Sequence, residues 1–88
     1  MQRIYKYVLG HASSDAIRVT MPKSAKIIHA NIQGGLSTIW VTVDPSIEDD
    51  IIRSFRVVGT GWDIPDNCKH VGTYFEGFFV WHVFEEIK

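Results

Sequence analysis

The run FFVWHVF at residues 78–84 constrains the fold more than any other stretch of the sequence. It holds four aromatic residues, two valines and one histidine, and it contains no glycine, proline or charged residue. Side chains alternate between the two faces of a strand, and here both faces are apolar, which is typical of an inner strand covered on both sides. A buried helix is the alternative, but the run is short and rich in aromatic and β-branched residues. We therefore predict a central β-strand, with Phe79 and Phe84 in the core.

Turn residues divide the rest of the chain into short segments with a strand-like alternation of side chains. The clearest hairpin is centred on Gly34-Gly35, because two glycines supply the positive φ angles that a tight turn needs. Ser46, followed three residues later by Asp49, predicts at most one short helical turn near residues 46–53. The expected strands are residues 2–9, 16–21, 25–33, 36–43, 53–59, 69–75 and 78–87.

The length of the chain, 88 residues, suits one domain spanning residues 1–88. Hydrophobic residues make up 45% of the sequence and charged residues 22%, which is ordinary for a globular domain. About seven short strands at regular spacing are typical of an antiparallel β-sandwich or a small barrel. We predict an all-β domain, either a compact sandwich or a partly open barrel.

The net charge and the cysteine content favour a particular location in the cell. The net charge of −1 creates no long-range field that would attract nucleic acid or acidic lipid. Cys68 is the single cysteine, so the chain can form no internal disulfide, which favours a reducing compartment. No stretch resembles a signal peptide or reaches the length of a membrane span. We predict a cytoplasmic protein with no membrane association.

Short motifs spread over nearly the whole chain carry a family resemblance. They are Lys6-Tyr7-x-Leu9, Met21-Pro22-x-x-Ala25-x-Ile27, Trp40-x-x-Val43-Asp44, Phe55-x-x-x-Gly59-Thr60-Gly61-x-x-Ile64, Val71-Gly72-Thr73 and Phe79-Val80-Trp81-His82-Val83-Phe84-Glu85. In these motifs the chain resembles a family of small uncharacterised proteins encoded mainly by bacteriophages and prophages. The resemblance implies a phage or prophage origin and a location in the host cytoplasm, and it implies no activity or catalytic residues. The chain departs from the family pattern in its longer acidic connection at residues 48–50.

Catalytic and metal-binding patterns are weak in this sequence. The four histidines, His11, His29, His70 and His82, lack the close spacing of a zinc site, and we predict no metal and no cofactor. Cys68 with His70 is the only suggestive nucleophile–base pair, and an ordinary loop thiol is the simpler interpretation. Gly59-Thr60-Gly61 lacks the lysine that follows a phosphate-binding loop, so a tight bend explains it better. These observations predict a protein that is not an enzyme.

Aromatic residues carry the most informative functional signal. Trp40 alternates with the aliphatic residues Ile39 and Val41, so it points away from the core that those residues supply. Such rings line a pocket, form a contact surface or cover a second core, and the sequence leaves these alternatives open. The predicted binding surface consists of Tyr5, Tyr7, Trp40, Trp62 and Trp81, with the polar residues His29, Arg56 and His82.

These residues predict a binding function and no catalytic activity. We expect an accessory protein that engages a host protein or a small molecule through an aromatic-rich sheet face, with self-association possible. The alternative is a single-stranded nucleic-acid binder in which the aromatic rings stack on bases. The near-neutral charge disfavours that alternative.

Overall fold

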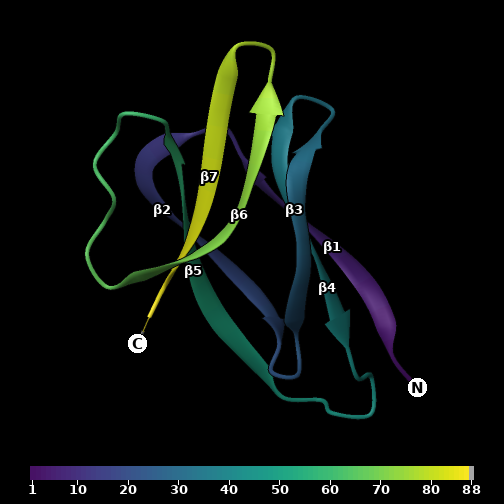
Figure 1. Cartoon of the computed structure of the whole chain (residues 1–88). Coiled ribbons are helices and arrows are strands. Elements are labelled where there is room, and N and C mark those ends of the chain that lie inside the picture. Colours follow the sequence, from purple (N-terminus) through teal and green to yellow (C-terminus); the bar gives the residue numbers. More distant parts are fainter. Residues whose placement is uncertain (88) are drawn as a thin grey trace.

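The computed structural model describes residues 1–87, which form seven β-strands and no helix (Figure 1). All strand pairs are antiparallel, and the strands form two separate sheets that do not close into a barrel. The prediction of an all-β sandwich is therefore confirmed. The strands are β1 (Arg3–Gly10), β2 (Ser13–Pro22), β3 (Lys26–Gln33), β4 (Leu36–Val43), β5 (Asp50–Gly59), β6 (Cys68–Glu76) and β7 (Phe79–Glu86).

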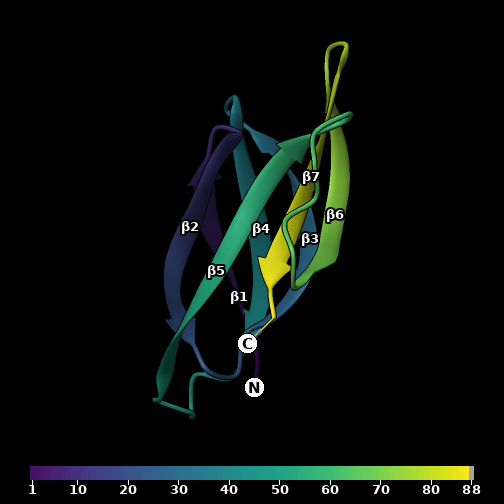
Figure 2. The same cartoon turned by 90° about the vertical axis from the view of Figure 1, so that its left-hand side faces the viewer.

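The chain changes sheets repeatedly. The three-stranded sheet has the order β1-β4-β3, and the four-stranded sheet has the order β2-β5-β7-β6. Figure 2 shows the two sheets as layers that face each other. β4, β5 and β7 are the inner strands, as predicted for the aromatic run that supplies β7.

The core lies between the inner faces of the two sheets. Phe55, Val57 and Val83 of the four-stranded sheet pack against Ile39 and Val41 of the three-stranded sheet, and all five are fully buried. Alternation along each strand explains this set, because every second residue of an inner strand meets the opposite sheet.

Each of the four edge strands carries a bulge, a place where it has more residues than its inner neighbour. The bulge in β3 lies between Ile27 and His29. It turns Ile27 and Ala30 toward the core and leaves Ile28 exposed. Strict alternation along residues 25–33 would place Ile28 and Ala30 on the same face, and the bulge breaks that alternation. The remaining bulges lie between Val8 and Gly10, Ser13 and Ile17, and His70 and Gly72.

The edge strands β3 and β6 approach each other along one side of the sandwich (Figure 1). The approach is closest where Gly72 meets Ala30. A Cβ atom at position 72 would lie 2.9 Å from the Ala30 Cβ, so this contact requires glycine. Small residues thus bring the two sheets together at this side.

Two strands begin three residues earlier than the sequence predicts. β2 starts at Ser13 and β5 at Asp50, and the helical turn expected near residues 46–53 does not form. Its place is taken by a turn at Asp44, whose carboxylate accepts hydrogen bonds from the Ser46 N–H at 3.0 Å and the Ser46 hydroxyl at 2.6 Å. These bonds lower the pKa of Asp44. Because Asp44 rather than Ser46 caps the turn, the chain leaves it in an extended conformation.

The two phenylalanines assigned to the core have different environments. Phe84 is buried on the outer face of the four-stranded sheet, where the His70 ring packs against it. Phe79 is 62% exposed, so its assignment to the core is wrong. It pairs with Glu76 next to the β6–β7 turn, in the part of this hairpin that projects beyond the opposite sheet (Figure 2).

Candidate functional site

Three exposed phenylalanines gather at the projecting end of the β6–β7 hairpin, and we call Phe75, Phe78 and Phe79 the hairpin tip. Phe75 is 72% exposed, Phe79 is 62% exposed and Phe78 is fully exposed. Gly77 has a φ of 59°, which allows the tight turn Gly77-Phe78 and places the Phe78 ring at its apex. Phe75 and Phe79 lie on opposite faces of the hairpin, because Phe75 pairs with Val80 and Phe79 with Glu76.

Further aromatic rings connect the hairpin tip to the body of the sandwich. The Phe79 ring stacks on Trp81, with centroids 5.5 Å apart and planes 12° apart. The Trp81 Nε1–H donates to the Glu76 carboxylate at 3.0 Å, which fixes the indole. Trp62 meets Trp81 edge-on, with centroids 5.9 Å apart. Gly59 leaves room for both indoles, since a Cβ there would lie 3.1 Å from each.

A small hollow of about 170 Å³ lies between the two sheets beside these indoles. Trp62, Trp81, Ile32 and Ser37 contribute to its lining. It is smaller than the cavities of about 300–1,000 Å³ that hold drug-sized ligands. The exposed rings of the hairpin tip lie outside it.

The predicted aromatic surface does not exist as one face. Tyr5 and Tyr7 pair with Val41 and Ile39 and thus share the inner face of the three-stranded sheet. Trp40 lies on the opposite, outer face, where it pairs with His29 and Lys6. The His29 and Trp40 rings are in contact, with centroids 5.6 Å apart. The prediction that Trp40 points away from the core is confirmed, whereas its grouping with the tyrosines is wrong.

Arg56 and His82 lie on the outer face of the four-stranded sheet, remote from Trp40. Arg56 donates to the Ser14 carbonyl at 2.6 Å and pairs with Glu86 at 3.4 Å. The His82 ring lies between two threonine hydroxyls, with Nε2 2.9 Å from Thr60 and Nδ1 3.0 Å from Thr73. These bonds hold the loop after β5 against the sheet. Of the predicted site residues, only Trp62 and Trp81 belong with the hairpin tip.

The thiol of Cys68 lies in surroundings that disfavour a nucleophile. Its pKa is raised, first by burial and then by the nearby Glu86 carboxylate, so the reactive thiolate is suppressed. His70, the suggested base, has its Nε2 2.8 Å from the Thr73 hydroxyl. Residues 1–87 contain no cluster of three or more histidine, cysteine or acidic side chains that could hold a metal ion.

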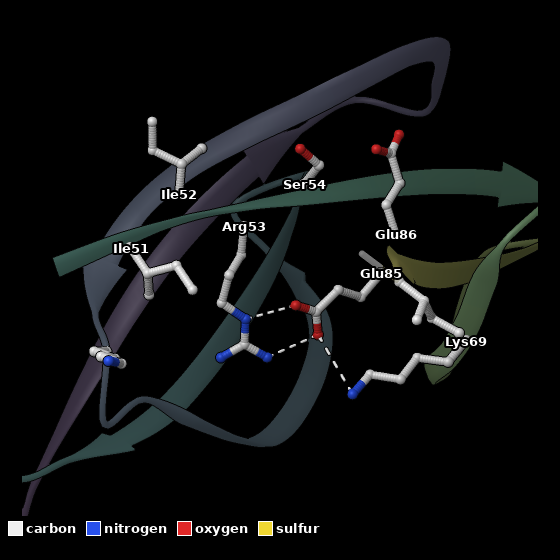
Figure 3. A pocket seen from close by; sticks show the side chains of 9 residues that line it. Ile51, Ile52, Arg53, Ser54, Lys69, Glu85 and Glu86 are labelled. Carbon is white, nitrogen blue, oxygen red and sulfur yellow. Dashed lines mark hydrogen bonds and ion pairs between the residues drawn. The ribbon is translucent and has the colours of Figure 1, made fainter.

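A buried ion pair lies at the other end of the sandwich (Figure 3). The Arg53 guanidinium donates to both carboxylate oxygens of Glu85, at 2.5 and 2.7 Å, and to the Ala25 carbonyl at 2.8 Å. The hydrogen bonds that Arg53 donates to Glu85 raise the pKa of Arg53. Lys69 approaches the same carboxylate at 3.9 Å. The pair itself lies within the four-stranded sheet, and it is the Arg53 hydrogen bond to Ala25, the residue before β3, that reaches the other sheet.

Comparison with known proteins yields a family but no functional precedent. Neither curated proteins nor solved structures gave a match. Within the described part of the chain, no helix is long and apolar enough to cross a membrane. One family model matches residues 1–88, the full length of the sequence. The chain therefore belongs to the family described as a domain of unknown function, DUF7352.

Proposed function

We propose that this chain is a non-catalytic binding protein that inserts its hairpin tip into a groove of a partner protein. The observation that carries the proposal is the exposure of three phenylalanines within five residues of one projecting hairpin. Covering one such side chain contributes roughly 1.5–3 kcal/mol, so three of them supply a substantial part of a specific interface. Natural sequences rarely leave this much aromatic surface in water without a partner.

The shape of the hairpin tip favours a protein partner over a small molecule. Phenylalanine rings lie on both faces of the hairpin and at its apex, so only a partner that surrounds the tip covers all three. A protein groove does this, whereas a small molecule needs a concave site. The resemblance to phage and prophage proteins supports a host protein in the host cytoplasm as this partner.

Photo-crosslinking tests the proposal directly. Benzoylphenylalanine at position 78 is expected to yield a discrete crosslink to one host protein when the chain is produced in a bacterial host. Position 4 provides the control, because Ile4 is an exposed apolar residue, 63% exposed, on the outer face of the three-stranded sheet. With the purified partner, Phe78→Ser and Phe79→Ser should each weaken binding about 30-fold, the loss of roughly 2 kcal/mol expected for an anchor residue.

Several outcomes would contradict this function. Crosslinks from both positions to the same set of proteins would indicate non-specific contact, and crosslinks only to a second copy would indicate self-association. Quenching of tryptophan fluorescence by short single-stranded DNA or RNA, strong at low salt and lost at high salt, would favour the nucleic-acid alternative.

The Trp40→Ala variant tests whether Trp40, on the outer face of the three-stranded sheet, belongs to a second core. We expect this variant to lower the free energy of unfolding by only about 1 kcal/mol, because the buried aliphatic side chains of β4 lie on its opposite face. Urea denaturation measures the change. A loss of several kcal/mol would show that Trp40 belongs to a second core, and would remove it from any contact surface.

A further inference from the structure

We propose that the hollow beside Trp62 and Trp81 binds the guanidinium group of an arginine side chain. Four parts of the chain line it: the β1–β2 connection, the β3–β4 hairpin, the loop after β5 and the β6–β7 hairpin. Its volume of about 170 Å³ suits one functional group of several atoms, since a single water molecule needs only about 10–15 Å³. The inference rests on the proposed function only for the source of the arginine, which is the partner that covers the hairpin tip.

Glu76 supplies the negative charge of the hollow. Its half-buried carboxylate accepts the Trp81 Nε1–H through one oxygen, at 3.0 Å, and no ion pair within residues 1–87 includes it. Among the described residues that line the hollow, Glu76 is the only charged one and His11 the only other titratable one. Such a carboxylate favours a cationic ligand, because hydrogen bonds between charged groups are stronger than those between neutral groups.

The cations of the surrounding strands are engaged elsewhere. Lys6 lies on the outer face of the three-stranded sheet and Arg56 on the outer face of the four-stranded sheet, and each has its own hydrogen-bond acceptors there. Ile87, the last described residue, donates to the Asn67 carbonyl beside the other end of β6. At about 3.3 Å per residue, that end is roughly 25 Å from Glu76. Glu76 is thus left without a cationic partner in the described part of the chain.

The Tyr74 hydroxyl is a second polar group that lacks a partner. Tyr74 is 4% exposed, and its hydroxyl has no hydrogen-bond partner within residues 1–87. Burial raises the pKa of Tyr74, the adjacent Ser37 hydroxyl opposes this rise, and the Glu76 carboxylate adds to it. The hydroxyl therefore lies close to Ser37 and Glu76, which both line the hollow. Because buried hydroxyls are nearly always hydrogen-bonded, a ligand that carries N–H groups fits here.

The two indoles select a guanidinium among the possible cations. Trp62 and Trp81 line the hollow with their centroids 5.9 Å apart, and a cation within about 6 Å of an indole is attracted to its ring. A guanidinium is planar and weakly hydrated and carries several N–H donors, so it stacks on an indole while it bonds to oxygen acceptors. An ammonium is compact and strongly hydrated, and it loses more hydration on entering.

The position of the hollow indicates that the arginine belongs to the partner protein. Phe79 of the hairpin tip stacks on Trp81, and Glu76 belongs to the same hairpin. Figure 1 shows the turns of the β3–β4 and β6–β7 hairpins, which both contribute to the hollow, at the same end of the sandwich. A groove that covers the hairpin tip therefore reaches the hollow as well. One buried polar contact beside the apolar ones fixes the orientation of the partner.

NMR titration of the unmodified protein with ethylguanidinium chloride tests the site without the partner. Each tryptophan has one indole N–H signal, and Trp40, on the outer face of the three-stranded sheet, is an internal control. The signals of Trp62 and Trp81 should shift to saturation with a Kd of roughly 1–10 mM, while that of Trp40 stays unchanged. Ethylurea, a neutral molecule of nearly the same shape, should bind about tenfold more weakly, and propylammonium about threefold more weakly.

Glu76→Gln provides the variant test, because it removes the charge and keeps an oxygen for the Trp81 N–H. It should bind ethylguanidinium about tenfold more weakly. Glu48→Gln, the same change at an exposed position outside the hollow, should bind it equally well. Tyr74→Phe should bind it about threefold more weakly, and its midpoint of urea denaturation should be no lower, because the hydroxyl has no partner to lose.

The results that would overturn the site are distinct from those that concern the partner. Equal binding of ethylurea or propylammonium, equal binding by Glu76→Gln or Tyr74→Phe, or an equal shift of Trp40 would each overturn the guanidinium site. Phe78→Ser should leave ethylguanidinium binding unchanged, so a failure of the proposed function does not affect this titration. With the purified partner, Glu76→Gln should weaken binding about tenfold. Unchanged affinity for the partner would overturn its role as the source of the arginine.

Discussion

Phe55→Ala is expected to lower the free energy of unfolding by about 3–5 kcal/mol, the cost of removing a large buried aromatic side chain. Phe55 is fully buried and lies on the inner face of an inner strand, between the two sheets. A domain of this size has a total stability of roughly 5–10 kcal/mol, so the variant should be partly unfolded at physiological temperature. Urea denaturation at 25 °C measures the change.

Phe79→Ala is the matched control for Phe55→Ala, because it makes the same chemical change at an exposed position. We expect a loss of less than about 1 kcal/mol. Equal losses at the two positions would mean that the hairpin tip packs against the rest of the chain in solution.

Glu85→Ala is expected to cost about 3–5 kcal/mol, because it leaves the Arg53 guanidinium without its carboxylate in a largely buried site. Replacing both partners, as in Arg53→Met with Glu85→Leu, should restore most of that loss. An apolar pair of similar volume has no charge to desolvate. Chemical denaturation of Arg53→Met, Glu85→Leu and the double variant that combines them forms a double-mutant cycle.

Arg56→Met supplies the comparison for the buried pair. Arg56 and Glu86 also bridge neighbouring strands, but both side chains are about 30% exposed. Water and salt screen this pair, so its loss should cost less than about 1 kcal/mol. A Glu85→Ala variant as stable as Arg56→Met would show that water reaches Arg53 and screens its pair with Glu85.

The fold class could be predicted from the sequence because inner strands alternate regularly. In β4, Ile39 and Val41 alternate with Thr38 and Trp40, and the structure keeps this division into inner and outer faces. The edge strands were harder to interpret. In β1 both faces mix apolar and polar residues, so the pattern did not reveal that Tyr7 rather than Ile4 meets the core.

The exposure of the hairpin tip was hidden by its composition. Residues 78–84 are as apolar as a buried strand, and the sequence does not encode how far a hairpin extends past the opposite sheet. The C-terminal half of β7, with Val83 and Phe84, is buried as predicted, while Phe78 and Phe79 lie beyond the edge of the core. The turn at Gly77 was the sequence feature that could have indicated this exposure, since residues beside a hairpin turn often lie outside the packed part of a sheet.

The exposure of Ile51 and Ile52, near the start of β5, could not be foreseen from residue types. Ile51 and Ile52 are ordinary strand residues, and their exposure depends on where β7 stops pairing with β5. Strand register is a tertiary property, set by distant partners rather than by local pattern.

The order in which the strands pair has a consequence for synthesis of the chain. β2 lies between β1 and β3 in the sequence, yet its partner is β5, and β5 in turn needs β7. When a ribosome has released residues as far as Val43, the three-stranded sheet is available but its apolar inner face has nothing to cover it, and β2 has no partner. The core is complete only after Glu86 has emerged, so folding follows synthesis of the whole domain. Because three of its five strand pairings join strands that are distant in the sequence, the protein should fold on the slow scale of milliseconds to seconds. During that interval the nascent chain depends on factors that shield apolar strands from one another.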